Sequence, residues 1–225
     1  MVRPEGGAVA GRGAETKRRI MQAAAKLFAE KGYHGTGMGD LEQAVNLRRG
    51  ALYYHIGNKE ALLHEISLSL VAEMQEFADD ISAQALPADE KLLLLTRRLM
   101  RMIAERQDEI IVFYREWEWL TGERRADVLA ARDRFEAVWE ALLAEGAAEG
   151  VFADKPPILV KGILGLINYS HLWFHASGSL APDDVADLFV DMILHGIAAP
   201  GHLDGEGRRT GDNDSGVRRT RTSLT

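Results

Sequence analysis

Two arginines, Arg48 and Arg49, stand side by side at the start of a short segment with helical character, and Gly50 follows them directly. An arginine guanidinium can donate two hydrogen bonds at once to the O6 and N7 atoms of a guanine. A glycine beside them lets the backbone approach a DNA duplex closely. Three side chains that can hydrogen-bond to phosphates come next: Tyr53, Tyr54 and His55. The spacing therefore predicts a segment that reads base edges in the major groove.

A second interpretation is that the two arginines form a solvated basic patch and that the tyrosines belong to the core. The distribution of charge bears on this choice. The net charge of the chain is −7, which by itself disfavours a polyanionic partner. Residues 1–60, however, carry 10 Lys and Arg against 6 Asp and Glu, whereas the remaining residues carry 17 against 28. The N-terminal part is therefore expected to attract DNA.

Three predicted helices position this segment. Apolar residues spaced i, i+4, i+7 and i+8 predict an amphipathic helix that begins at Thr16 and ends at Gly32. Short helices over 37–44 and 48–54 follow, and Asn46 between them tolerates the positive φ of a tight turn. Two short helices joined by a tight turn behind a supporting helix are the parts of a helix-turn-helix, with the arginines on its second helix.

The remaining chain also follows helical periodicity, and no stretch shows the alternation typical of a strand. A long helix is predicted from Asn58 to about Ser82, with Lys59 in its first turn, where its ammonium group can reach a phosphate. Further helices are expected around residues 92–103, 110–120, 129–142, 157–176 and 185–193. The predicted fold is all-α, with about nine helices.

Composition divides the chain into four predicted parts. Residues 1–14 are rich in Gly and Ala without an apolar period, and residues 201–225 are almost entirely polar, so both are expected to be disordered. Between them we predict a DNA-binding domain over 15–60 and a helical domain over 61–200.

Several classes of protein are disfavoured by what the sequence lacks. There is no cysteine, no signal-peptide core in residues 1–14 and no apolar run long enough to span a bilayer. Hydrolase, metalloprotease and P-loop motifs are missing as well. His171 and His175, spaced i, i+4, could hold a divalent cation, but we expect them to be pocket or interface histidines. We expect a cytoplasmic protein that is not an enzyme, binds no membrane and uses no cofactor or metal.

Residues 16–66 closely resemble the DNA-binding domain of the TetR family of regulators. The resemblance is carried by LFAEKGY at 27–33, Asp40-Leu41, the GALY run at 50–53 and Lys59-Glu60-x-Leu62. It implies contacts with operator DNA by Thr36, Arg48, Arg49, Ala51, Tyr53, Tyr54, His55 and Lys59. Three positions depart from the family pattern: Asn46 replaces a usual glycine, Glu42 a small residue and Gly39 an often basic one.

The resemblance also implies a homodimer whose seam lies on the last two helices. Gly162 and Gly165 lie within an apolar helical run, where small residues permit close approach of a second helix. Leu188 and Met192 lie on the amphipathic helix that follows, and we expect all four residues in the seam. The alternative is that the glycines pack inside one protomer.

A pocket for a small hydrophobic effector is expected among the central helices. Five aromatic residues can wall an apolar chamber and four polar residues can supply its hydrogen bonds: Phe113, Tyr114, Trp117, Phe135 and Trp139, with Arg132, Asn168, His171 and His175. Residues 113–152 and 167–196 resemble the C-terminal domain of regulators of fatty-acid and steroid-ring breakdown, which implies an acyl-CoA effector. A drug-like effector, or a DNA-binding dimer without any effector, are the alternatives.

Overall fold

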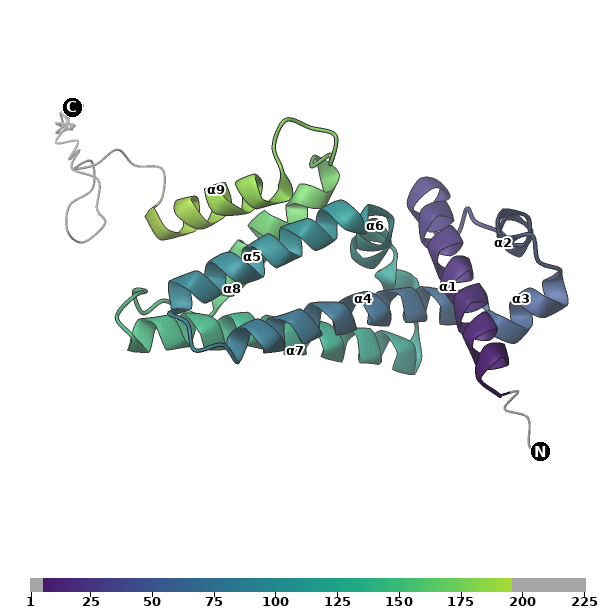
Figure 1. The fold of residues 1–225 in the computed structure, drawn as a ribbon, viewed down its shortest axis with the longest axis horizontal. Helices are drawn as coiled ribbons and strands as arrows, with labels where there is room; N and C mark the ends of the chain where they lie inside the picture. The colour runs from purple at the N-terminus through teal and green to yellow at the C-terminus, as the bar shows by residue number, and fades with distance from the viewer. Residues whose placement is uncertain (1–5, 196–225) are drawn as a thin grey trace, which may run out of the picture.

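The computed structural model describes residues 6–195, and these form nine α-helices and two short 3-10 helices (Figure 1). No strand occurs within this range, so the predicted all-α fold is confirmed. None of the described helices is both long and apolar enough to cross a membrane. The predicted tail, residues 201–225, and residues 1–5 of the predicted arm lie outside the described residues.

The N-terminal unit consists of α1 (Gly6–Lys31), α2 (Met38–Val45) and α3 (Arg49–Ile56). Its core is made by Phe28, Leu41 and Leu52, one from each helix and all fully buried. Asn46 adopts the left-handed conformation, with φ 52° and ψ 47°, and ends α2 as predicted. A short polar side chain costs little in this conformation, which explains why Asn can replace the usual glycine.

The first helix is longer than predicted, because α1 begins at Gly6 and not at Thr16. The prediction that residues 1–14 form a disordered arm is therefore wrong for residues 6–14. A helix that is already nucleated by a buried face extends at low cost, because each added residue brings one further hydrogen bond. The alanines at positions 8, 10 and 14 favour this extension, since alanine has the highest helix propensity.

The larger unit contains α4 (Lys59–Ser82), α5 (Ala88–Glu105), α6 (Gln107–Arg115), α7 (Gly122–Ala148), α8 (Ile158–Asn168) and α9 (Pro182–His195). Helices α4 and α7 pack along each other, and α9 lies on α5 (Figure 1). Helix α6 packs against both α1 and α4, so it joins the two units. This arrangement makes α6 the obvious element through which one unit can influence the other.

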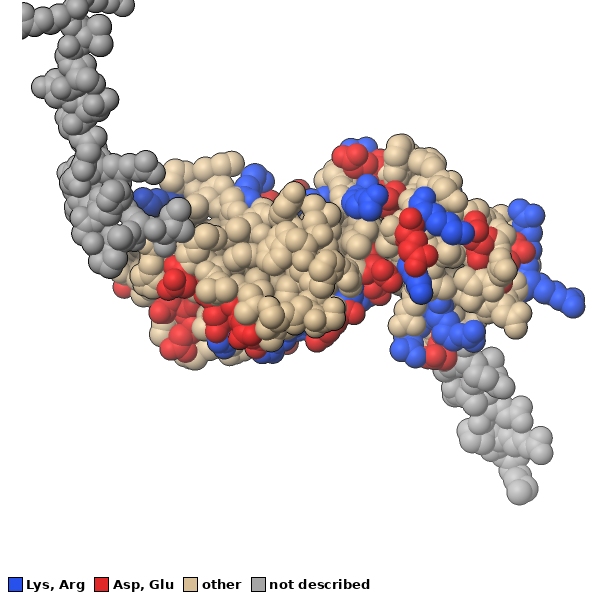
Figure 2. All heavy atoms as spheres, turned by 90° about the horizontal axis from the view of Figure 1, so that it is seen from above, with Lys and Arg blue, Asp and Glu red and all other residues tan. Residues whose placement is uncertain are grey.

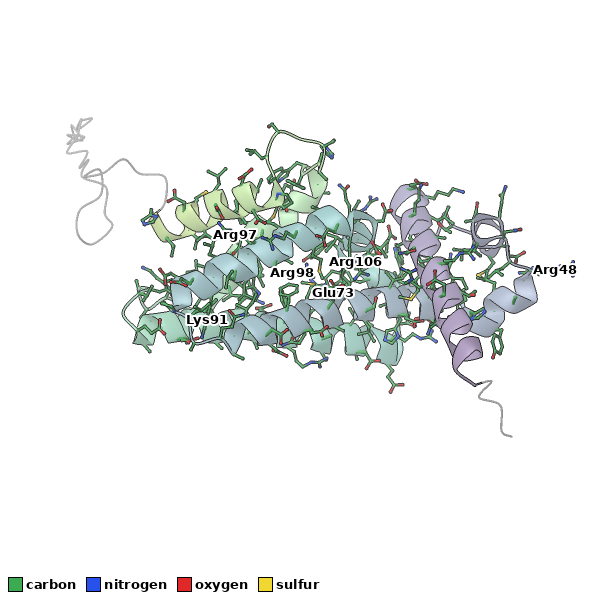
Figure 3. The ribbon with its side chains drawn as sticks, in the orientation of Figure 1. Arg48, Glu73, Lys91, Arg97, Arg98 and Arg106 are labelled. Atoms are coloured by element: carbon green, nitrogen blue, oxygen red, sulfur yellow. The ribbon has the colours of Figure 1, made fainter. Side chains whose placement is uncertain are left out.

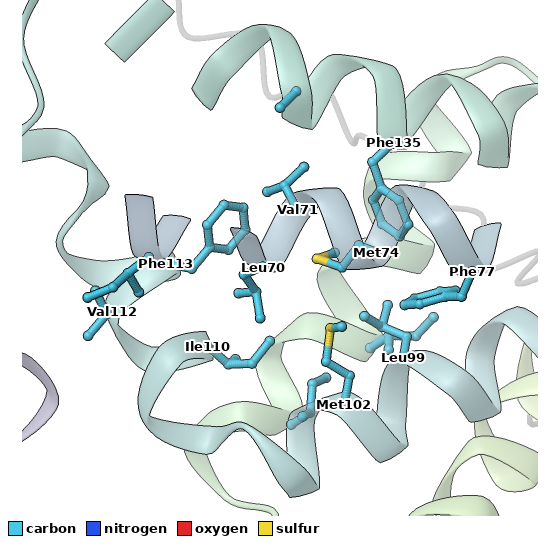
Figure 4. Close-up of a cluster of buried hydrophobic side chains, with 14 of the residues drawn as sticks. Leu70, Val71, Met74, Phe77, Leu99, Met102, Ile110, Val112, Phe113 and Phe135 are labelled. Carbon is cyan, nitrogen blue, oxygen red and sulfur yellow. The ribbon is translucent and has the colours of Figure 1, made fainter. Parts of the chain in front are cut away.

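The core of the larger unit follows the apolar stripe of α4. Leu70, Met74 and Phe77 of α4 point toward Leu99 and Met102 of α5 (Figure 4), and all five side chains are buried. Burial of one such side chain contributes about 1.5–3 kcal/mol, so this interface contributes to the stability of the unit. Arg98 of α5 and Arg106, just beyond its C-terminal end, both bind Glu73 of α4, which fixes the two helices in register (Figure 3).

Two predicted helices end earlier than expected. Helix α6 stops at Arg115 and is followed by the 3-10 helix η1 (Trp117–Trp119), so Trp117 is not part of a continuous sixth helix. Helix α8 stops at Asn168 and is followed by η2 (Tyr169–Leu172). His175 lies beyond both. The expectation that His171 and His175 share one helical face is therefore wrong.

Candidate DNA-binding and effector sites

Helix α3 turns most of its polar residues outward. Leu52 and Ile56 anchor it in the core, while the residues predicted to contact bases are all exposed: Arg48, Arg49, Gly50, Ala51, Tyr53 and Tyr54. Tyr54 is 86% exposed, which rules out the interpretation that places it in the core. Arg48 lies at the end of the molecule farthest from the larger unit (Figure 3). The outward face of α3 is thus free to enter a groove.

The two arginines differ in their surroundings. Arg48 is the N-cap of α3 and makes no ion pair with any residue of the described chain. The guanidinium of Arg49 lies 3.7 Å from a carboxylate oxygen of Glu42 and its Cζ is 5.8 Å from the centre of the Tyr53 ring. The Tyr53 hydroxyl, and then the Glu42 charge, raise the pKa of Arg49. The unusual residue Glu42 therefore orients one of the two arginines.

Small residues lie beside these arginines. A Cβ atom built on Gly50 would meet no atom within 4 Å, and Ala51 is exposed. No side chain longer than a methyl group projects from these two positions, so the start of α3 can approach a base pair closely. His55 is half-buried and its ring lies edge-on to Tyr54 at 5.3 Å.

Thr36 does not have the role that the resemblance implied. Its side chain is fully buried, and its hydroxyl donates hydrogen bonds to the carbonyl oxygens of Leu27 (3.1 Å) and Gly32 (3.0 Å). A hydroxyl that is committed in this way cannot contact DNA without unfolding the turn. Thr36 instead satisfies carbonyl groups at the C-terminal end of α1, which would otherwise be orphaned there.

Lys59 is also committed inside the protein. Its ammonium group donates to the carbonyl oxygens of Tyr33 (2.8 Å) and Thr36 (3.0 Å) and lies 4.3 Å from the centre of the Tyr33 ring. These carbonyls occupy two of its three N–H donors, so one donor is left and the predicted contact with a phosphate stays a prediction. Lys59 fastens the start of α4 to the turn between α1 and α2.

We expect Lys59→Met to weaken operator binding because the start of α4 is then no longer held to the turn between α1 and α2, and not because a phosphate contact is lost. A hydrogen bond from a charged group is worth about 1.5–3 kcal/mol, so the melting temperature should fall by several degrees. The slope of operator affinity against salt should stay unchanged, whereas loss of a phosphate contact lowers it by about 1. Lys26→Met, at an exposed position of α1, is the control. If the melting temperature is unchanged and the salt slope is reduced, we would conclude that Lys59 contacts a phosphate.

The four residues predicted for the dimer seam lie on α8 and α9, and none of them is buried. Gly162 and Gly165 are exposed, and a Cβ atom built on either would meet nothing within 4 Å. The alternative that these glycines pack inside one protomer is therefore wrong. Leu188 is 60% exposed and Met192 is half-buried.

More apolar side chains surround these four. Helix α9 is held on α5 by ion pairs of Arg97 with Asp187 and of Arg101 with Asp183, so its other side faces solvent. The exposed apolar side chains of this region are Ile158, Leu159, Tyr169, Leu172, Trp173, Leu188 and Leu194. Figure 2, which looks at the side that carries α9, shows a broad area with few charged groups. Apolar patches of this kind mark protein–protein contact. We call these residues the α8–α9 face.

A cavity of about 350 Å³ lies between α4, α6, α7 and α8. Five of the predicted effector-binding residues line it: Phe113, Tyr114, Arg132, Phe135 and Asn168. No sequence signal pointed to its other lining residues, which are Val71, Met74, Glu136, Lys161, Leu164 and Gly165. We call this the central cavity. Burial raises the pKa of the Tyr114 phenol well above its usual value, so that phenol is neutral.

The other four predicted residues do not line the central cavity. Trp117 and His171 lie behind its wall: Trp117 stacks on Arg132 at 4.8 Å, and His171 stacks on Tyr114 at 5.2 Å. Trp139 is 1% exposed and packs in the core against Phe135. His175 is exposed and outside the cavity.

A second cavity, of about 390 Å³, lies at the end of the larger unit away from the helix-turn-helix. Its lining is mostly apolar, with the charged residues Glu140, Asp154 and Lys155 as exceptions, and it includes none of the predicted effector-binding residues. The central cavity differs from it in having lining residues with buried polar atoms that lack a hydrogen-bond partner, namely Arg132 Nη1 and Asn168 Oδ1.

The two units meet at a corner beside η1. Glu116 is 6% exposed, and its carboxylate accepts a hydrogen bond of 3.1 Å from the backbone N–H of Tyr33, just beyond α1. The ring of Trp119 meets His34 edge-on at 4.2 Å. Beside this corner, within the larger unit, Glu60 of α4 accepts from the backbone N–H and the hydroxyl of Thr121, and these bonds lower the pKa of Glu60. We call the contacts of Glu116 with Tyr33 and of Trp119 with His34 the interdomain corner.

Two family models match the chain. The model described as "Bacterial regulatory proteins, tetR family" matches residues 20–66, and that described as "Tetracyclin repressor-like, C-terminal domain" matches residues 85–197. The chain belongs to the TetR family. The first match covers the helix-turn-helix and the second runs from before α5 to the end of α9, so the resemblance is confirmed for both units.

Curated relatives over most of the chain are TetR-type repressors. The HTH-type transcriptional repressor KstR2 of Rhodococcus jostii is 24% identical over 187 residues, which are 82% of this chain and 92% of the relative. KstR2 of Mycobacterium tuberculosis is 24% identical over 199 residues, 86% and 98% of the two chains. The protein is therefore a TetR-type transcriptional regulator.

Solved structures agree with the fold. The TetR family regulator PfmR from Thermus thermophilus superposes with a TM-score of 0.76 and 33% identity, over 80% of this chain and 100% of that one. AibR, solved in complex with isovaleryl coenzyme A and operator DNA, superposes with a TM-score of 0.73 and 26% identity, over 80% and 98%. Both units of this chain therefore have the TetR arrangement.

Proposed function

We propose that the protein is a homodimeric repressor that binds a pseudo-palindromic operator and is released by a small hydrophobic effector. The observation that carries the proposal is the outward face of α3. This short helix and its N-cap carry two arginines, the small residues Gly50 and Ala51, and the exposed Tyr54. The chemistry of this exposed face suits the major groove of DNA.

The α8–α9 face supports the dimer. A helix-turn-helix reads a half-site of only a few base pairs, so tight binding needs two reading heads on one side of the duplex. A two-fold axis through the α8–α9 face would bury the apolar residues that one protomer leaves exposed. The same axis would place the two α3 helices on two half-sites.

We expect Arg48→Ala to cost about 1–3 kcal/mol of specific operator affinity, which is about five- to 160-fold, and to relax recognition at one base pair. Arg49→Ala should cost less, because the Glu42 carboxylate and Tyr53 already engage its guanidinium. The measurement is binding to an operator selected from random DNA and to its single-base variants. Arg134→Ala, at an exposed position of α7, is the control. If both arginine variants bind the operator with wild-type affinity, the residues that contact the bases lie elsewhere in the protein.

An acyl-CoA thioester is the effector class that we propose. AibR, 26% identical to this chain, was solved with isovaleryl coenzyme A and operator DNA together. The central cavity of about 350 Å³ is near the lower end of the range for ligand sites, roughly 300–1,000 Å³. It therefore accommodates an acyl group, while the nucleotide part of the effector would lie outside.

The interdomain corner supports release as the direction of switching. Filling the central cavity presses on α6 and α7, and α6 leads directly to Glu116 at the corner. A shift there would turn the helix-turn-helix units relative to each other and spoil their spacing. A hundredfold loss of operator affinity needs about 2.7 kcal/mol of coupling, which a few charged hydrogen bonds can supply.

Fluorescence anisotropy of a labelled operator tests this function. A panel of acyl-CoA thioesters should dissociate the complex, while coenzyme A alone should not. If only drug-like compounds dissociate the complex, the effector belongs to that class. A complex that no compound dissolves would favour a DNA-binding dimer without an effector.

A further inference from the structure

Three polar groups from three helices converge on the central cavity. Arg132 comes from α7, Asn168 from α8 and Tyr114 from α6, and the rest of the wall is mostly apolar. Arg132 Nη1 and Asn168 Oδ1 are buried atoms without a hydrogen-bond partner. Buried polar atoms are nearly always hydrogen-bonded in native proteins. Two residues that line one cavity and each carry an unpartnered buried polar atom therefore point to a ligand that supplies both partners.

Arg132 is held in place by aromatic rings but not by an anion. Its Cζ lies 4.8 Å from the centre of the Trp117 ring and 5.3 Å from that of Phe113. Glu136 lies one turn further along α7, yet its carboxylate binds Lys161 at 2.5 Å instead. Among the ion pairs of residues 6–195, none involves Arg132. The guanidinium is thus fixed in direction with a donor left over for an oxygen atom.

Asn168 complements this donor with an acceptor. Its backbone carbonyl bonds to Nδ1 of His171 (2.6 Å), and the His171 ring stacks on Tyr114. These contacts fix Asn168 and Tyr114 relative to each other. The side-chain oxygen of Asn168 is left to accept from an N–H or O–H group of a ligand. A ligand that satisfies both residues must therefore carry an acceptor for Arg132 and a donor for Asn168.

We propose that Arg132 and Asn168 together recognise the thioester linkage of the effector. This inference rests on the acyl-CoA effector proposed above. Arg132, with the Tyr114 hydroxyl, donates to the thioester carbonyl oxygen, and Asn168 accepts from the amide N–H that follows the sulfur and two carbons of the pantetheine arm. A free carboxylate supplies only the acceptor. The linkage, and not the acyl chain alone, then distinguishes an activated acyl group from its free acid.

Matched probes separate the two contacts. Isovaleryl and octanoyl groups are each offered as the CoA thioester, the N-acetylcysteamine thioester, the S-ethyl thioester and the free acid. The N-acetylcysteamine thioester keeps the amide N–H, whereas the S-ethyl thioester lacks it. We expect the wild type to bind the former at least tenfold more tightly than the latter by calorimetry.

Two variants and one control test the residues. Asn168→Leu should abolish the tenfold preference, and Arg132→Met should weaken every thioester at least tenfold. Arg134→Met, an exposed arginine two residues away on α7, should bind all probes as the wild type does. Unchanged binding by Arg132→Met, or an unchanged preference in Asn168→Leu, would overturn the proposal. A wild type that binds no thioester would also overturn the proposal. Operator binding, measured in parallel, would then show whether the proposed repressor function still holds.

The melting temperature of the effector-free dimer gives a readout that a structural role would not produce. An unpaired, partly buried charge is kept at a cost, so Arg132→Met should leave the melting temperature equal or raise it. If Arg132 served only to pack against Trp117 and Phe113, the substitution should lower it. A lowered melting temperature with unchanged thioester binding would assign Arg132 to the core.

Discussion

Replacing Leu188 by glutamate is expected to turn the protein into a monomer that binds its operator at least a hundredfold more weakly than the wild type. Leu188 is 60% exposed on the α8–α9 face, and two copies of a glutamate would meet across the two-fold axis. Burying like charges without partners costs several kcal/mol, which exceeds what such an interface can lose. Sedimentation gives the oligomeric state and anisotropy gives the operator affinity.

Leu129→Glu is the matched control, because Leu129 is also an exposed leucine (38%) but lies on α7. It should remain a dimer and bind DNA normally. Gly165→Leu would be a poorer test than Leu188→Glu, because Gly165 lines the central cavity and its substitution could also change effector binding. A Leu188→Glu variant that stays dimeric with full operator affinity would move the seam elsewhere.

The architecture was predictable because helix punctuation and apolar periodicity are local. Gly32 ends α1 with a φ of 77°, and Asn46 ends α2 in the left-handed region, as their residue types indicated. The breaks at Arg115 and Asn168 were not predictable, because an apolar stripe continues across both. A 3-10 turn keeps the same residues buried while changing their direction.

The DNA-contact residues show what a family resemblance can and cannot supply. It named Arg48 and Tyr54 as DNA contacts, and both are exposed at or on α3, as such a role requires. It could not reveal that the Thr36 hydroxyl and two of the three N–H donors of Lys59 bind carbonyl groups, which for Lys59 belong to Tyr33 and Thr36, 26 and 23 positions away along the chain. Whether a polar side chain is free is a property of packing rather than of residue type.

The effector site was harder because an aromatic ring can either pack in the core or line a void. Phe135 and Trp139 lie one turn apart on α7, yet Phe135 borders the central cavity and Trp139 is enclosed. The contribution of α4 through Val71 and Met74 was missed for the same reason, since aliphatic residues carry no chemical signal. Arg132 was recognisable because a charge inside an apolar helix face is rare.

We expect a substitution of Glu116 to uncouple effector binding from DNA binding. Its buried carboxylate holds the N–H of Tyr33, and its neighbour Trp117 stacks on Arg132 at the cavity wall. This is a continuous set of contacts from the central cavity to the turn that Lys59 fastens to α4. Such a charged hydrogen bond, worth about 1.5–3 kcal/mol, is comparable with the roughly 2.7 kcal/mol of coupling that hundredfold release requires.

We therefore expect Glu116→Ala to bind effector and operator separately with near-wild-type affinity, while effector-driven release falls from about a hundredfold to less than tenfold. Glu116→Gln, which retains an acceptor for the Tyr33 N–H, should release at an intermediate level. Glu118→Ala, at an exposed position of η1, should release normally. Because coupling is reciprocal, operator DNA should lower effector affinity by the same reduced factor in Glu116→Ala. Full release by that variant would place the coupling in α4 rather than at the interdomain corner.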